Sequence, residues 1–127
     1  MPQLPEAAVN LEEILNSHAE WKEKFLGAIR SREQLDSESI SSERCCMLGK
    51  WLLDEAIHVH GTQRNYQRLV QTHAAFHFEA GMVARLINEQ QYEAALAQMS
   101  LYSPLALSSH AVYAAITLFF RERVIPA

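Results

Sequence analysis

The sequence predicts an all-α fold, an antiparallel four-helix bundle with a short additional helical segment. Gly and Pro number only 4 each among 127 residues, so few residues suit the tight turns of β-hairpins. Apolar residues recur at steps of three and four along most of the chain, which is the period of a helix buried on one side. Hydrophobic residues make up 49% of the chain, enough for one core in a single domain.

The first predicted helix covers about residues 10–34, where the bundle domain at 10–123 begins. Asn10 can cap its first turn, because an asparagine side chain accepts hydrogen bonds from free backbone amides. Its apolar stripe is Leu11, Ile14, Leu15, His18, Trp21, Phe25 and Ile29. We therefore expect His18 in the middle of the buried face. Residues 1–9 carry two prolines and are expected to form a flexible arm.

Residues 36–42 are rich in serine and acidic side chains, which predicts a loop with a short helical turn. Ser41 or Ser42 can cap a second helix, which carries Cys45, Cys46, Leu48, Trp51, Leu52 and Ala56. We expect this helix to end just before Gly61. Gly61 is expected to take the left-handed backbone conformation that is common just after a helix end. A third helix is predicted from about Thr62 to Asn88. Its buried stripe is Tyr66, Leu69, Val70, His73, Phe76, His77, Ala80, Val83, Ala84 and Ile87.

The last helical region covers about residues 92–123, followed by a tail at 124–127. Pro104 lacks an amide hydrogen and clashes with the preceding turn, so we expect a kink or break between Ser100 and Pro104. A wide apolar arc follows, formed by Ala111, Val112, Ala115, Ile116, Phe119 and Phe120. A bundle of this size cannot easily bury the whole arc, so we expect a homodimer interface there.

Charge and cysteine content exclude several classes of partner. The chain has 15 acidic and 11 basic residues and a formal charge of -4, without a Lys/Arg run. We therefore expect neither nucleic acid nor a membrane as a partner. The N-terminus lacks the basic start and apolar run of a signal peptide. Adjacent cysteines, here Cys45 and Cys46, rarely pair with each other, so a reducing cytoplasm is the expected location.

Three histidines lie on predicted buried stripes. His73 and His77 are four residues apart, which places them about 6 Å apart on one helix face. A single histidine is usually a satisfied core or surface residue, but an unpaired imidazole on an apolar face carries a desolvation cost. His18 repeats that situation on another helix. His58 and His60 are expected to form a polar helix end, with a second metal site as a minor alternative, and His110 to be a packing or surface residue.

Cys46 completes a set of four soft or borderline ligands. Alone it would be a small buried hydrophobe. Gly49 shares its helix face and removes a side chain, which would let a neighbouring helix approach the thiolate. Cys45 points about 100° away around the helix and is expected to be no ligand, although it could capture an oxidised Cys46 as a disulfide. His18, Cys46, His73 and His77 together favour a closed tetrahedral zinc site, with Trp21, Trp51 and Phe76 as apolar walls.

Three motifs occur in order: His18-Ala19-Glu20-Trp21, Cys46-Met47-Leu48-Gly49-Lys50-Trp51 and His73-Ala74-Ala75-Phe76-His77. With this pattern, the chain from about residue 10 to 120 resembles the bacterial chemoreceptor zinc-binding (CZB) family. The resemblance implies a helical, often dimeric bundle with the same four residues as zinc ligands. It also implies signal transduction, such as chemotaxis, through a chemoreceptor or diguanylate cyclase, with zinc or an oxidant such as hypochlorite as the signal. Since these 127 residues include no output domain, we expect the signal to pass to a partner unless the chain is a cut domain.

We expect no enzymatic activity and no catalytic or further cofactor-binding residues. A catalytic zinc keeps an open position, whereas four protein ligands fill this one. The metalloprotease motif needs Glu after the first His, where this chain has Ala74. Only one Glu-x-x-His spacing, Glu55 to His58, is present for a di-iron site. The expected function is a zinc or redox sensor acting through Cys46. A structural zinc bundle for dimerisation or partner binding, and a metal-free interaction bundle, are the alternatives.

Overall fold

A computed structural model describes residues 11–124 of the chain. Every regular element in this range is helical, so the prediction of an all-α protein is confirmed. The expected arm at residues 1–9, the Asn10 cap and the tail from residue 125 onward lie outside the described residues. None of the helices in the range 11–124 is both long and apolar enough to cross a membrane.

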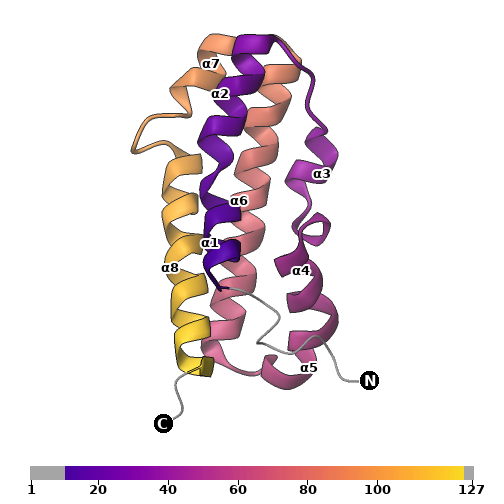
Figure 1. Cartoon of the computed structure of the whole chain (residues 1–127), viewed down its shortest axis with the longest axis vertical. Coiled ribbons are helices and arrows are strands. Elements are labelled where there is room, and N and C mark those ends of the chain that lie inside the picture. The colour runs from indigo at the N-terminus through magenta and orange to yellow at the C-terminus, as the bar shows by residue number, and fades with distance from the viewer. Residues whose placement is uncertain (1–10, 125–127) are drawn as a thin grey trace.

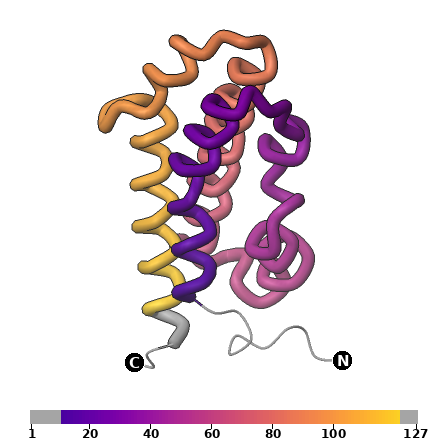
Figure 2. Tube along the Cα trace, turned by 45° about the horizontal axis from the view of Figure 1, so that its top comes forward, coloured from indigo at the N-terminus to yellow at the C-terminus, as the bar shows by residue number. Residues whose placement is uncertain are grey.

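The helices are arranged as long columns beside a column of short pieces (Figures 1 and 2). The long elements are α1 (Leu11–Ala19) with α2 (Trp21–Ser31), α6 (Arg64–Asn88) and α8 (Pro104–Val124). The short pieces are α3 (Ser37–Ser41), a 3-10 turn (Glu43–Cys45), α4 (Met47–Trp51), a π-helical turn (Leu52–Ala56) and α5 (Ile57–His60). In Figure 1, α8 stands on one side of α6 and the short pieces stand on the other. The short α7 (Tyr92–Ala97) precedes α8 at the top of the molecule.

The first predicted helix is divided into α1 and α2. The helix is interrupted at Glu20, whose backbone angles of φ -82° and ψ -2° depart from those of a regular α-helix. The second half ends at Ser31 because Arg32 takes a left-handed conformation, with φ 59°, and its amide donates to Ala28 O. The connection to α3 is held by Asn88 at the end of α6. Its Oδ1 accepts from Leu35 N at 2.7 Å and its Nδ2 donates to Leu35 O at 2.8 Å.

The expectation of one regular second helix from residue 41 or 42 to residue 60 is wrong. Ser42 is a cap as predicted, but it caps the short 3-10 turn, where its Oγ accepts from Arg44 N at 3.2 Å. Cys46 has an extended backbone and caps α4 itself. Gly61 has φ -56°, so the expected left-handed conformation at this position is also wrong. The chain therefore restarts its helix several times between Asp36 and His60, because local side chains supply new caps.

Pro104 breaks the last helical region as predicted. α7 ends at Ala97, and Pro104 is the first residue of α8, a position where its missing amide costs nothing. Ser103 holds the connection, since its Oγ donates to Gln98 O at 2.7 Å and accepts from Ala106 N at 3.1 Å.

Five of the six residues of the predicted apolar arc of α8 lie in the core, and only Ala111 of that arc is exposed, so the arc itself offers little surface to a partner; the homodimer stays a prediction. Phe119 and Phe120 are 1% and 2% exposed. Val112, Ala115 and Ile116 are also buried. α8 packs against both α1 and α6, which together cover a wider arc than a single neighbouring helix would. The Trp51 indole adds to the cover, with its ring centroid 5.7 Å from that of Phe120 and 6.1 Å from that of Phe119.

Candidate metal centre

The structure brings the four predicted ligand residues together. His18 comes from α1, Cys46 from the start of α4, and His73 and His77 from successive turns of α6. One ligand atom from each residue lies within 4.8 Å of the other three. Among the side chains that the structure describes, no second group of three or more His, Cys, Asp or Glu residues is arranged in this way. The minor alternative of a metal site at His58 and His60 therefore has no support in the described residues.

The separations within the cluster suit a tetrahedral zinc ion. Zinc–nitrogen bonds of about 2.0–2.1 Å and a zinc–sulfur bond of about 2.3 Å put nitrogens about 3.3 Å apart and sulfur about 3.6 Å from nitrogen. Here His73 Nε2 lies 3.1 Å from His77 Nε2. The Cys46 Sγ lies 3.3 Å from His73 Nε2 and 3.7 Å from His77 Nε2. These three atoms can therefore bind one ion with little rearrangement.

Backbone carbonyls orient two of the imidazoles. The His18 Nδ1–H donates to Ile14 O at 2.8 Å, one turn earlier in α1. The His77 Nδ1–H donates to Ile40 O in α3, also at 2.8 Å. Because Nδ1 of each ring carries the hydrogen, Nε2 carries the lone pair that a metal needs. Such partners also fix the ring orientation before a metal arrives.

Gly49 brings the Cys46 thiol and the His73 ring close together. The Gly49 amide donates to Cys46 Sγ at 3.3 Å. A Cβ on Gly49 would overlap with Glu43 O and would lie 2.7 Å from Glu43 C and 3.1 Å from His73 Cε1. The expectation that Gly49 allows a close approach is confirmed. The approaching backbone, however, is the 3-10 turn just before Cys46, rather than another helix.

Burial sets the charge of the cluster when no metal is bound. Burial, together with the neighbouring His77 and His18, lowers the pKa of His73 to about 3. Burial also lowers the pKa of His18 and raises the pKa of the Cys46 thiol. In the metal-free protein, burial therefore favours the neutral forms of His18, His73 and the Cys46 thiol. A divalent metal would find the His18 and His73 imidazoles already in their binding form and would displace the proton of the Cys46 thiol.

A pocket of about 370 Å³ opens onto one side of the cluster. Three of the candidate ligands line it, namely His18, Cys46 and His77. Its other lining residues are Ser17, Glu20, Trp21, Lys24, Phe25, Ser39, Ile40, Cys45, Phe76 and Ala80. His73, at 1% exposure, closes the inner side of the cluster. Small molecules can therefore reach the site from one direction.

The three predicted aromatic walls differ in position. Phe76 borders the cluster, with its ring centroid 5.7 Å from that of His18 and 5.5 Å from that of His77. Trp21 lines the pocket beside it. Trp51 instead stacks on Phe120 and meets Phe119 edge-on, both residues of α8 in the hydrophobic core.

The remaining histidines are spread over other parts of the structure. His60 is buried against the Phe119 ring at 5.5 Å, so the expected polar helix end applies to the exposed His58 alone. His110 is exposed on α8, as the sequence suggested.

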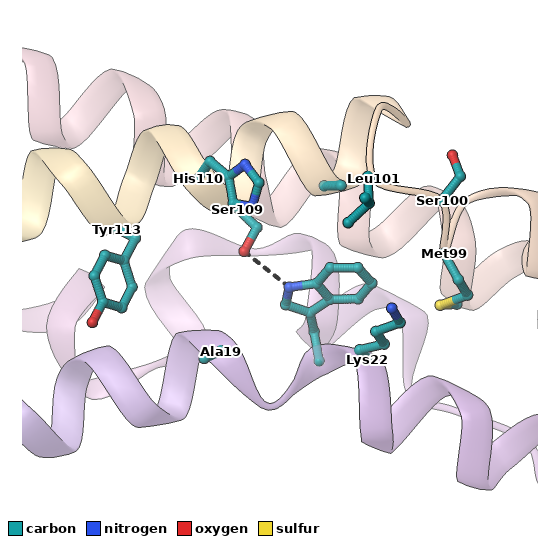
Figure 3. Close-up of a pocket in the computed structure, with 10 residues that line it drawn as sticks. Ala19, Lys22, Met99, Ser100, Leu101, Ser109, His110 and Tyr113 are labelled. Carbon is teal, nitrogen blue, oxygen red and sulfur yellow. Dashed lines mark hydrogen bonds between the residues drawn. The ribbon is translucent and has the colours of Figure 1, made fainter.

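Trp21 also lines a second pocket of about 260 Å³, between the α1–α2 turn and α8 (Figure 3). Its Nε1–H donates to Ser109 Oγ of α8 at 2.9 Å. Figure 3 shows Ser109, His110 and Tyr113 on α8, across the pocket from Ala19 and Lys22. Trp21 thus joins α8 to the segment that carries His18.

The fold and the cluster define a helical protein with a partly buried site of three histidines and one cysteine. The family model described as chemoreceptor zinc-binding domain matches residues 18–84, more than half of the chain. The chain therefore belongs to the chemoreceptor zinc-binding domain family, which confirms the resemblance in its motifs. The matched range contains all four candidate ligands. Searches of curated proteins and of solved structures found no match.

Proposed function

We propose that the protein is a zinc-binding sensory domain, in which His18, Cys46, His73 and His77 hold one zinc ion. The observation that carries the proposal is the convergence of these ligand atoms within 4.8 Å of one another. Imidazole and thiolate are the ligands that zinc prefers, and four protein ligands make a closed site. A closed site leaves no position for a substrate, so the proposal includes no enzymatic activity.

The site suits a sensor because it joins separate segments of the chain. Zinc bound there connects α1, the start of α4 and α6, which form a four-helix bundle with α8 in this proposal. One thiolate beside Zn²⁺ leaves the site with a net charge of about +1, which holds Cys46 in the form that oxidants attack. Hypochlorous acid, for example, converts the thiolate to sulfenic acid and releases chloride. The weakened ligand then allows α4 to move relative to α6.

The output requires a partner in this proposal. α8 packs on α1 and α6, so a change at the cluster can reach its outer surface. A cytoplasmic chemoreceptor or diguanylate cyclase would receive the change, or a second copy of the chain in a homodimer.

The first test is the zinc content of protein purified without chelators or metal-affinity resins. We expect about one zinc ion per chain, and a large loss of zinc in Cys46→Ala. Cys45→Ala is the matched control and should keep its zinc, because the neighbouring thiol is no ligand in the cluster. Wild-type protein that carries no transition metal would refute the proposal.

A purely structural zinc site is the second candidate. It is favoured by the short pieces between Ser37 and His60, which lack the length to be stable helices alone. Circular dichroism after zinc removal separates the two functions. A structural site predicts loss of most helicity, whereas a sensor keeps its helicity and changes only its packing. For the sensor, hypochlorite should also release zinc to an indicator dye, and Cys46 should then be found as sulfenic acid by mass spectrometry.

A further inference from the structure

The pocket between the α1–α2 turn and α8 carries a lysine in its lining (Figure 3). The chain has 15 acidic residues, yet none that the structure describes lines this pocket, whereas Lys22 does. Among the described side chains, no carboxylate forms an ion pair with Lys22. The volume of about 260 Å³ lies just below the range of about 300–1,000 Å³ typical of small-molecule sites. The pocket therefore suits a ligand of one or two rings that carries a negative charge.

Ser109 offers a hydroxyl hydrogen to such a ligand. Its Oγ accepts the Trp21 Nε1–H at 2.9 Å, so its own hydrogen must be donated elsewhere. In the part of the chain that the structure describes, this hydrogen has no acceptor, whereas the neighbouring Ser108 donates to Leu105 O at 3.1 Å. Figure 3 shows Ser109 on α8, across the pocket from Lys22. A hydroxyl and an ammonium on opposite walls can hold the two oxygens of a carboxylate.

Aromatic and aliphatic side chains form much of the rest of the lining. The Trp21 indole is fixed by its hydrogen bond to Ser109, and Tyr113 follows one turn later on α8. Met99 and Leu101 come from the connection between α7 and α8, where Leu101 is 67% exposed. A flat apolar ligand would gain from covering these side chains, because apolar surface is removed from water and aromatic rings pack well on one another. The ligand expected here therefore has an aromatic body as well as a charge.

We propose that this pocket binds a small aromatic carboxylate, whose oxygens are held by Lys22 and Ser109. The ring of the ligand lies against Trp21 and Leu101. None of the four candidate zinc ligands lines this pocket, so the proposal goes beyond the metal site and does not depend on it. A ligand of about a dozen non-hydrogen atoms should bind with a dissociation constant of about 0.01–1 mM.

The probe is 2-naphthoate, titrated into the isotope-labelled full-length chain as purified and followed by nuclear magnetic resonance. The chain has two tryptophans and should give two indole N–H signals, of which Trp21→Phe removes and thereby identifies one. The Trp21 signal should shift until it saturates. The Trp51 signal should stay in place, because that indole is buried against Phe120 in the core. The uncharged 2-naphthamide, which has the same ring system, should bind about fivefold more weakly or less tightly still.

Two lysine variants test whether the charge at the pocket matters. Lys22→Gln should weaken the binding of 2-naphthoate about three- to fivefold and leave that of 2-naphthamide unchanged. Lys24→Gln is the matched control, since Lys24 is also an exposed lysine of α2 but lines the other pocket. It makes the same change in net charge and should bind like wild type. Both positions are exposed, so the fold should persist in each variant.

Several results would overturn the proposal. One is the absence of a saturating Trp21 shift at probe concentrations up to about 10 mM. Equal weakening in the two lysine variants would show general attraction to positive charge, and equal binding of the amide would show that no carboxylate is recognised. Full affinity in Lys22→Gln would place the probe elsewhere, for example at the metal cluster. Wild-type protein without zinc would refute the proposed function and leave these expected results unchanged.

Discussion

Substitution of Gly49 by alanine tests how closely the zinc site depends on the backbone around it. The new Cβ would overlap with Glu43 O and would lie 2.7 Å from Glu43 C. It would also lie 3.1 Å from His73 Cε1. Since the nearest atoms belong to backbone, they cannot rotate away as a side chain could. Either the 3-10 turn or the start of α4 must move, and Cys46 lies between them.

The expected cost follows from overpacking. Inserting a methyl group into a tightly packed site typically costs about 1–3 kcal/mol. If that strain is relieved by moving Cys46 from its ligand position, the zinc dissociation constant rises by about 5- to 150-fold. Competition with a chromophoric chelator measures the affinity, and urea denaturation of the metal-free protein measures the part of the strain present without zinc.

Gly27→Ala is the matched control. A Cβ on Gly27, in α2, has no other atom within 4 Å. Alanine there should stabilise the helix by about 0.4–1 kcal/mol and leave zinc affinity unchanged. If Gly49→Ala matches wild type in both affinity and stability, then Glu43 and Gly49 are not in the close contact described here, and the reasoning fails.

Three further predictions concern the rest of the molecule. In the metal-free protein, the pKa of His73 is about 3 when folded and 6.5 when unfolded, so the unfolded state binds this proton at a higher pH than the folded state does. The contribution of His73 to the free energy of unfolding is therefore fully present above pH 6.5. Below pH 6.5 the free energy of unfolding, measured by urea denaturation, should fall by about 1.4 kcal/mol per pH unit. Asn88→Ala removes both hydrogen bonds to Leu35 and should cost about 1–3 kcal/mol, and an unchanged unfolding midpoint would contradict the bridge. Phe119→Ala should lower the free energy of unfolding by about 3–5 kcal/mol, independently of protein concentration. Leu118→Ala, at a side chain that is 38% exposed, should cost far less. A loss of stability that depends on protein concentration would instead place Phe119 in an interface.

The candidate site could be predicted from the sequence because the residues that can bind zinc also occur at the spacing of a buried helix face. His73 and His77 occupy one face of a long helix, and His18 lies on the buried stripe of another. The Pro104 break was equally readable, since proline has a local effect on the backbone. In each case a rule that acts within a few residues decides the outcome.

The segment between residues 36 and 60 was less predictable because distant groups decide it. Asp36, Ser42 and Cys46 each cap a different short element, and the sequence offers no ranking among such caps. Tyr66 of α6 donates its hydroxyl hydrogen to Leu52 O at 2.6 Å, in the π-helical turn. A backbone carbonyl that accepts a hydrogen bond from a side chain fourteen residues away can drop out of the regular α-helical hydrogen-bond pattern. The periodic pattern of apolar residues in the sequence does not reveal such a hydrogen bond.

The burial of α8 also depends on information that one helix does not contain. Its apolar residues cover a wide arc, which fits either an interface or two neighbouring helices. The structure places α1 and α6 along that arc and adds Trp51 from the α4 segment. Only the number of neighbours distinguishes these outcomes, and that number depends on how the whole chain packs.

A zinc ion bound by these ligands would cross-link the chain into two consecutive loops, because the ligands follow one another in the order His18, Cys46, His73 and His77. Zinc would close one loop from His18 to Cys46 and another from Cys46 to His73, each just under thirty residues long. By the relation used for disulfides, closing a loop of that length restricts the unfolded chain by about 3.5 kcal/mol. Cys46 belongs to both loops. If its bond alone is lost, the histidines still join α1 to α6, and the chain between them becomes one larger, looser loop. The freedom gained at Cys46 is therefore confined to the α3–α4 segment, while the long helices stay tied together.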